Sequence, residues 1–199
     1  MPRPKVYDED LRRRLVARAA VMMAESGPSG LALRQLAAAE VTSTTAIYSM
    51  FEDRAGLIRE VGRTAAVSFV DAQRAVSKTA DPFVDLFSLG RAYRGWALAN
   101  PTLYLVLMAP AAPGMHHFDA PIPESEAAEP LREVIVRLIQ AGIFPPLDPN
   151  VVLGIIWASV HGFVSLELAG FFAPTPQDSL DLMYEAQLDS IGRGWRTTA

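Results

Sequence analysis

The chain of 199 residues contains no cysteine and only two lysines, against sixteen arginines. The absence of cysteine excludes disulfides, thiolate metal sites and a thiol nucleophile. No segment alternates apolar and polar residues over a length that would predict a β-sheet, and no internal repeat is present. Half of the residues are apolar, which excludes an intrinsically disordered chain and is enough for a substantial hydrophobic core.

Charge is unevenly distributed along the chain, although the formal net charge is only −4. Residues 1–18 carry a net charge of +3, whereas residues 61–199 carry −5. A basic head on an acidic body is typical of a polyanion-binding segment joined to an unrelated domain, but a solvated amphipathic helix gives the same pattern. The N-terminus is charged where a secretion signal is apolar, so we expect a cytoplasmic protein.

One segment, 151–173, is long and apolar enough to cross a bilayer. It contains His161 and Glu167, however, and an acidic residue in the middle of a membrane span is costly. Its flanks are acidic and carry no Lys or Arg that would anchor it. We therefore predict a helix buried inside a domain or a dimer, and no membrane partner.

Proline and glycine mark the boundaries of the expected elements. No proline lies between Pro28 and Pro82, and the stretch 31–55 also lacks glycine, so it can be almost entirely helical. Prolines cluster within 110–130, which predicts a long loop that we expect to gate a ligand pocket. The apolar spacing predicts an all-α fold with helices at 8–25, 33–40, 44–50, 54–79, 82–99, 101–109, 126–142, 149–172 and 177–194.

Two short helices within 31–57 predict a helix-turn-helix. Ser43 suits the N-cap of the second helix, because its hydroxyl can accept a hydrogen bond from an unpaired backbone N–H. Ile47 and Phe51, four residues apart, are expected to point inward as anchors. The residues expected to face a DNA groove or its phosphates are Arg34, Ser43, Thr44, Thr45, Ala46, Tyr48, Ser49 and Arg54. The residues alone leave open an ordinary pair of core helices.

The segment resembles the DNA-binding domain of the TetR family of transcriptional regulators. The resemblance lies in the turn at 41–43, the pair Ile47-Tyr48, and the following Phe51, Arg54 and Leu57. Val41 stands where the family usually has a turn glycine, which would strain a β-branched residue if φ is positive there. Arg54 stands where the family has a phosphate-contacting lysine, which keeps the charge and changes the geometry.

The remainder of the chain resembles a TetR branch that is named for a Trp-His-Gly motif. The matching residues are Tyr93, Trp96, Pro101 and Tyr104, then Trp157, His161, Gly162 and Glu167. The resemblance implies a DNA-binding domain at 1–58 and a ligand-binding and dimerisation domain at 59–199. It also implies a ligand-responsive regulator, most often a repressor, that binds an inverted-repeat operator as a homodimer.

The residues of the second domain support both a dimer and a pocket. Small residues let helices pack closely, so a dimer interface is expected at Gly154, Ala158, Gly162 and Ala169, with packing inside one subunit as the alternative. A small hydrophobic ligand is expected at Trp96, Tyr104, Leu107, Met108, His161 and Phe163. Each of these six is also compatible with ordinary core, and His161 with a hydrogen bond to Tyr93 or to a backbone carbonyl.

The sequence offers no sign of catalysis. It has no phosphate-binding glycine loop, nucleophile elbow, paired carboxylates or His-Glu metal motif, so we expect neither an enzyme nor a cofactor. His116 and His117 are adjacent, and neighbours in sequence rarely converge on one metal ion, so we expect no metal site there. The remaining alternative is an all-helical adaptor that binds other proteins and not DNA.

Overall fold

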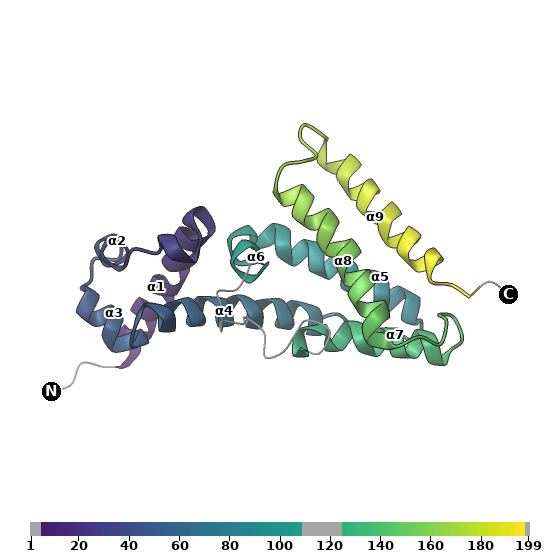
Figure 1. Ribbon diagram of the computed structural model, residues 1–199, viewed down its shortest axis with the longest axis horizontal. Coiled ribbons are helices and arrows are strands. Elements are labelled where there is room, and N and C mark those ends of the chain that lie inside the picture. Colours follow the sequence, from purple (N-terminus) through teal and green to yellow (C-terminus); the bar gives the residue numbers. More distant parts are fainter. Residues whose placement is uncertain (1–4, 109–124, 198–199) are drawn as a thin grey trace. The chain divides into compact units, whose positions relative to one another are not determined.

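The computed structural model describes residues 5–108 and 125–197, and within these ranges the fold is all-helical, as the sequence predicts (Figure 1). The predicted helices lie close to the observed ones in position and length. The observed helices are α1 (Lys5–Ser26), α2 (Leu33–Ala39), α3 (Thr44–Phe51), α4 (Arg54–Arg74), α5 (Pro82–Ala99), α6 (Pro101–Met108), α7 (Glu129–Gln140), α8 (Pro149–Leu168) and α9 (Gln177–Gly194). Most of the expected gating loop, with His116 and His117, lies outside the described residues.

The helices form two compact units. The first contains α1, α2, α3, α6 and the part of α4 up to Val67, and the second contains the rest of α4 with α5, α7, α8 and α9. The functional boundary expected after residue 58 falls inside α4, and it stays a prediction. The grouping of α6 with the N-terminal helices was not expected from the sequence.

The core of the first unit is built on the apolar stripe of α1. Leu15 and Ala19 are fully buried and pack with Leu36, Ile47 and Val61 from the following helices. Helix α6 packs against α1 and contributes Val106 to the same cluster. Because α2 and α3 are too short to be stable alone, their position depends on this shared core.

The second unit is a bundle in which α5 packs against α7, α8 and α9 (Figure 1). Its core joins Leu86 and Leu89 of α5 to Ile135, Leu153 and Ile156 of the neighbouring helices. Polar contacts also cross between the helices: Arg94 of α5 forms a bidentate ion pair with Glu167 of α8, with N–O distances of 2.6 and 2.7 Å. These contacts fix the register of the amphipathic and apolar helices in the bundle.

Two helices, α4 and α8, end well before the residues that the sequence predicts. Helix α4 ends at Arg74 rather than at 79, because the backbone N–H and hydroxyl of Thr79 both donate to Asp85, at 2.9 and 2.7 Å, and hold the loop before α5. Helix α8 ends at Leu168 rather than at 172, where Gly170 takes a φ of 74°. Glycine adopts this left-handed conformation without steric cost and commonly ends a helix.

Candidate functional site

Helix α3 begins with the cap that its sequence predicts. The Ser43 hydroxyl accepts a hydrogen bond from the backbone N–H of Ala46 at 3.1 Å. Ile47 and Phe51 are buried in the core of the first unit, as predicted. Thr45, Tyr48 and Ser49 are consequently on the exposed side, and Tyr48 keeps half of its surface accessible.

The turn before α3 has a positive φ at Val41, the position where the family usually has glycine. Val41 has a φ of 50° and is 95% exposed. A left-handed backbone is unfavourable for a β-branched residue. The exposed valine gains no burial that offsets this strain, so the turn itself is held by the two helices that flank it.

The connection from α3 to α4 is also tightly built. The backbone N–H of Asp53 donates to the Phe51 carbonyl at 2.7 Å across Glu52, which has a φ of 65° and forms a γ-turn. The Asp53 carboxylate then accepts from the backbone N–H of Gly56 at 2.6 Å. A Cβ placed on Gly56 would lie 2.0 Å from the Phe51 carbonyl oxygen, so only glycine fits there.

Arg54 is half-buried, and its guanidinium binds backbone carbonyls. Its Nε donates to the Leu31 carbonyl at 2.9 Å, and its Nη2 donates to the Pro28 carbonyl. This arginine therefore ties the start of α4 to the segment between α1 and α2. The predicted phosphate contact stays a prediction, and the structure adds a positioning role that the sequence did not indicate.

The arginines of α1 mostly bind acidic side chains of the same unit. Arg12 forms an ion pair with Glu60, Arg13 and Arg14 form ion pairs with Asp10, and Arg14 and Arg18 form ion pairs with Glu40. Arg12 also donates to the Met50 carbonyl at 3.0 Å, and its guanidinium lies over the Phe51 ring at 4.8 Å. Within this basic stretch, Arg12 contacts α3 directly, and Arg14 and Arg18 bind Glu40 at the end of α2.

Two arginines of the unit outside α1 are exposed and can meet a polyanion. Arg34 of α2, a predicted contact residue, is exposed, and so is Arg59 of α4, which the sequence analysis did not select. No ion pair is recorded for either within the described ranges. The remaining predicted residues lie on α3 or at its start: Ser43, Thr45, Tyr48 and Ser49 are exposed, and Thr44 and Ala46 are half-buried.

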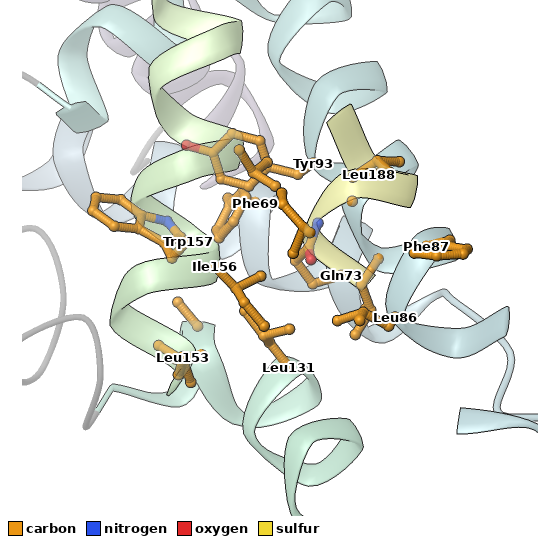
Figure 2. Close-up of a pocket in the computed structure, with 16 residues that line it drawn as sticks. Phe69, Gln73, Leu86, Phe87, Tyr93, Leu131, Leu153, Ile156, Trp157 and Leu188 are labelled. Carbon is orange, nitrogen blue, oxygen red and sulfur yellow. The ribbon is translucent and has the colours of Figure 1, made fainter. Parts of the chain in front are cut away.

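The second unit contains a largely apolar cavity of about 40 Å³ (Figure 2). The lining carries no charged side chain. The residues are Phe69, Gln73, Leu86, Phe87, Leu89, Gly90, Tyr93, Ala127, Ala128, Leu131, Leu153, Ile156, Trp157, Val160, Leu188 and Ile191. Such a wall suits a small hydrophobic ligand.

None of the six residues predicted to bind ligand belongs to this lining. Trp96, His161 and Phe163 lie in the second unit, in helices that wall the cavity. Tyr104, Leu107 and Met108 belong to α6 in the first unit, where Tyr104 and Leu107 are buried. Their role as ligand contacts stays a prediction, whereas the cavity itself points to neighbours such as Tyr93 and Trp157.

Of the two partners that the sequence left open for His161, the structure shows Tyr93. The Nδ1 of His161 lies 2.9 Å from the Tyr93 hydroxyl, and the histidine ring stacks on Trp157 with centroids 4.8 Å apart. Burial lowers the pKa of His161 below its usual value, because the charged imidazolium loses hydration. The Tyr93 and Trp157 rings that line the cavity are thereby held in place by a neutral histidine.

Helix α8 presents an apolar face that the described residues of the second unit leave exposed. Val151, Ile155 and Leu166 are between 42% and 54% exposed, and they follow helical spacing. The predicted dimer residues lie on or beside this face: Ala158 and Ala169 are exposed, and Gly154 and Gly162 are half-buried. A Cβ on Gly154 or Gly162 would meet no atom within 4 Å, so the protomer itself does not require glycine there.

In length and composition α8 would also suit a membrane span, and among the described residues it is the one helix that does. Its polar side chains favour the bundle instead. His161 and Glu167 both bind side chains of α5. Within the described part of the chain, no group of three metal-binding side chains is found.

Comparison with known proteins identifies relatives of the chain. Residues 86–191 match the family model described as "Tetracyclin repressor-like, C-terminal domain". An HTH-type transcriptional regulator of Mycobacterium tuberculosis is 24% identical over 90% of this chain and 89% of its own length.

Solved structures agree with this match. The regulatory protein SCO4313 shares 30% identity with a TM-score of 0.71, over 96% of this chain and 98% of its own. PfmR, a TetR family transcriptional regulator from Thermus thermophilus, shares 20% identity with a TM-score of 0.69, over 92% of this chain and all of its own. The names of these relatives describe regulatory proteins. The chain belongs to the TetR family of helix-turn-helix transcriptional regulators.

Proposed function

We propose that the protein is a cytoplasmic transcriptional repressor that binds an inverted-repeat DNA operator as a homodimer and is released by a small hydrophobic ligand. The observation that carries the proposal is the exposed face of α3. Thr45, Tyr48 and Ser49 lie there together, on a helix that is capped by Ser43 and anchored by the buried Ile47. The start of such a helix reads base edges in a major groove, and hydroxyls can bond to base edges and phosphates.

The exposed apolar face of α8 supports the proposal that the protein forms a homodimer. Large apolar side chains such as Val151 and Ile155 are exposed on α8, and Leu182 and Met183 are exposed on α9. The open space above Gly162 leaves room for a helix from a second copy. A two-fold dimer places two copies of α3 on successive half-sites, so the operator should be an inverted repeat.

The uncharged cavity of the second unit supports the proposal that the protein binds a small hydrophobic ligand. Helix α4 runs from the first unit, which holds α3, into the second, where Phe69 lines the cavity. A ligand that binds one conformation of the second unit more tightly can therefore shift α4 and change the spacing of the two DNA-reading helices. Linkage requires DNA to weaken ligand binding by the same factor, typically about 5- to 150-fold.

Selection of DNA fragments from a random library by the purified full-length protein tests operator recognition. We expect enrichment of a motif with two-fold symmetry, whose half-sites are about one helical turn apart or a multiple of it. A steep loss of affinity with salt should accompany it, because phosphate contacts release counterions. Enrichment of no motif, together with weak binding at low salt, would favour a helical adaptor.

A further inference from the structure

Gln73 occupies a position on α4 where an apolar residue is expected. The buried stripe of α4 runs through Val61, Ala65 and Phe69 at intervals of four residues, and the next position on that stripe is Gln73. Gln73 is only 6% exposed. Its Nε2 is the one buried side-chain nitrogen or oxygen, among those that the structure describes, that has no hydrogen-bond partner.

The carboxamide of Gln73 lies in the wall of the apolar cavity, and Figure 2 shows it at the centre of the lining side chains, between Phe69 and Leu86. Tyr93 and Trp157 are the other side chains of this wall that carry a polar atom; the Tyr93 hydroxyl lies at hydrogen-bond distance from His161, and the Trp157 ring stacks on the same histidine. Among the described residues of this wall, Gln73 therefore supplies the buried polar atom that has no hydrogen-bond partner.

An unpaired amide in such a place requires an explanation. A buried donor without an acceptor is unfavourable, and a glutamine could be replaced by methionine or leucine of similar volume. On the apolar side a water molecule is a poor partner, because a buried water needs two to four polar contacts and most of that wall is hydrocarbon. A ligand atom that enters with its own acceptor satisfies the amide without that requirement.

Charge around Gln73 is balanced, which indicates a neutral ligand. Gln73 also lines a neighbouring, more polar cavity of about 290 Å³. The charged side chains of that second cavity are all engaged in ion pairs: Arg74 with Glu129, Lys78 with Glu133, and Asp85 with Arg137. Neither cavity therefore offers an unpaired charge that would hold an ionised group.

We propose that Gln73 determines ligand specificity: the ligand is a neutral, mainly apolar molecule with a hydrogen-bond acceptor, a carbonyl or hydroxyl oxygen, that binds the Gln73 carboxamide. The inference rests on the proposed function only in taking this cavity as the ligand site. The apolar walls hold the hydrocarbon part of the ligand, and Gln73 orients it and rejects analogues that lack the oxygen, because such analogues leave the amide unpaired.

Two nearly isosteric single-ring compounds test this inference; both exceed the free cavity of about 40 Å³, so the side chains of the wall must move apart to admit them. Acetophenone carries a carbonyl where isopropenylbenzene carries a methylene group. Calorimetric titration of the full-length protein should show acetophenone binding about 3- to 10-fold more tightly, the equivalent of one net hydrogen bond. In Gln73→Met the preference should disappear, while isopropenylbenzene binds at least as well as before.

The unliganded variant gives a second measurement. Gln73→Met should melt at or above the temperature of the wild type, because it removes an unpaired buried amide. A lower melting temperature would mean that the amide has a partner in the free protein, and would overturn the inference. Leu86→Met in the same wall is the matched control and should keep the preference for acetophenone. If Gln73→Met does not fold, Gln73→Leu takes its place in both measurements.

Equal preference in the wild type and in Gln73→Met would overturn the inference, and so would a wild type that binds neither compound. Operator binding of the unliganded wild type and Gln73→Met, measured alongside, separates this result from the proposed function. Retained operator binding with no preference for the ketone contradicts only the role of Gln73. A retained preference with no operator binding contradicts only the proposed function.

Discussion

At the scale of single residues, some arginines of this protein hold backbone segments in place through hydrogen bonds. Arg54 shows this directly, because it joins the carbonyls of Leu31 and Pro28 to the start of α4. A sequence comparison can recognise that Arg54 stands at a phosphate-contacting position. It cannot recognise that two backbone carbonyls lie within reach, since these come from a turn more than twenty residues away.

We predict that Arg54→Ala lowers the free energy of unfolding by about 1–3 kcal/mol, because two partly buried carbonyls lose a charged donor. Arg54→Lys should recover only part of this loss, since one ammonium cannot reproduce the fork of a guanidinium. Urea unfolding followed by circular dichroism measures both. Arg59→Ala, at an exposed arginine of the same helix, is the control and should change stability by less than about 0.5 kcal/mol.

His161 gives a prediction on pH. Burial holds the pKa of His161 below that of an unfolded histidine. The unfolded chain therefore binds a proton at a higher pH than the folded one, so stability falls as pH drops below about 6.5 toward the folded pKa. His161→Gln removes this contribution, and its melting temperature should fall less than that of the wild type between about pH 7.5 and pH 5.5. An equal fall in both proteins would assign the pH dependence to other groups.

At the scale of elements, the short α3 depends on the turns at its two ends. The turn before it holds Val41 at positive φ, and the turn after it brings Gly56 against the Phe51 carbonyl. Much of this region was predictable: the cap at Ser43 and the anchors Ile47 and Phe51 follow from spacing alone. The close approach at Gly56 was not, because it depends on the γ-turn at Glu52 rather than on a pattern in the sequence.

Gly56→Ala should therefore destabilise the protein by about 1–3 kcal/mol, as overpacking does. The direction of the change in stability is informative, because alanine in an ordinary helix position is about 1 kcal/mol more favourable than glycine. Thermal unfolding measures the change. Gly95→Ala, in α5 with no atom within 4 Å of the added Cβ, is the matched control and should stabilise the protein or leave it unchanged. A stabilising Gly56→Ala would mean that the turn is looser than described.

At the scale of the whole molecule, periodicity and resemblance predicted the helices and the family, and most helix ends followed from proline and glycine. The lining of the cavity was harder to predict. Aromatic bulk suggested Trp96 and Tyr104, but Tyr104 is buried in the first unit. The sequence analysis did not select Gln73, a polar residue on the apolar stripe of α4 that lines the cavity. Composition finds bulky apolar residues easily, whereas packing decides which of them face a cavity.

The proposed dimer makes a prediction at this scale. Ala158→Arg places a charge in the middle of the exposed apolar face of α8 and should convert the dimer into a monomer with the helical content unchanged. Sedimentation equilibrium at micromolar concentration measures the mass. Ala99→Arg, at an exposed alanine of α5, should remain a dimer. A wild type that is monomeric at every concentration would contradict the proposed assembly.

The most direct test of the account is the affinity of α3 variants for the selected operator, measured by fluorescence anisotropy at fixed salt. Thr45→Ala should weaken operator binding by about 1–3 kcal/mol if it reads a base, with little effect on a scrambled duplex. Tyr48→Ala should also weaken binding, and Ser29→Ala, at an exposed serine outside α3, should leave it unchanged. If Thr45→Ala and Tyr48→Ala fold normally and bind the operator as tightly as the wild type does, then α3 is not the DNA-reading helix and the account is wrong.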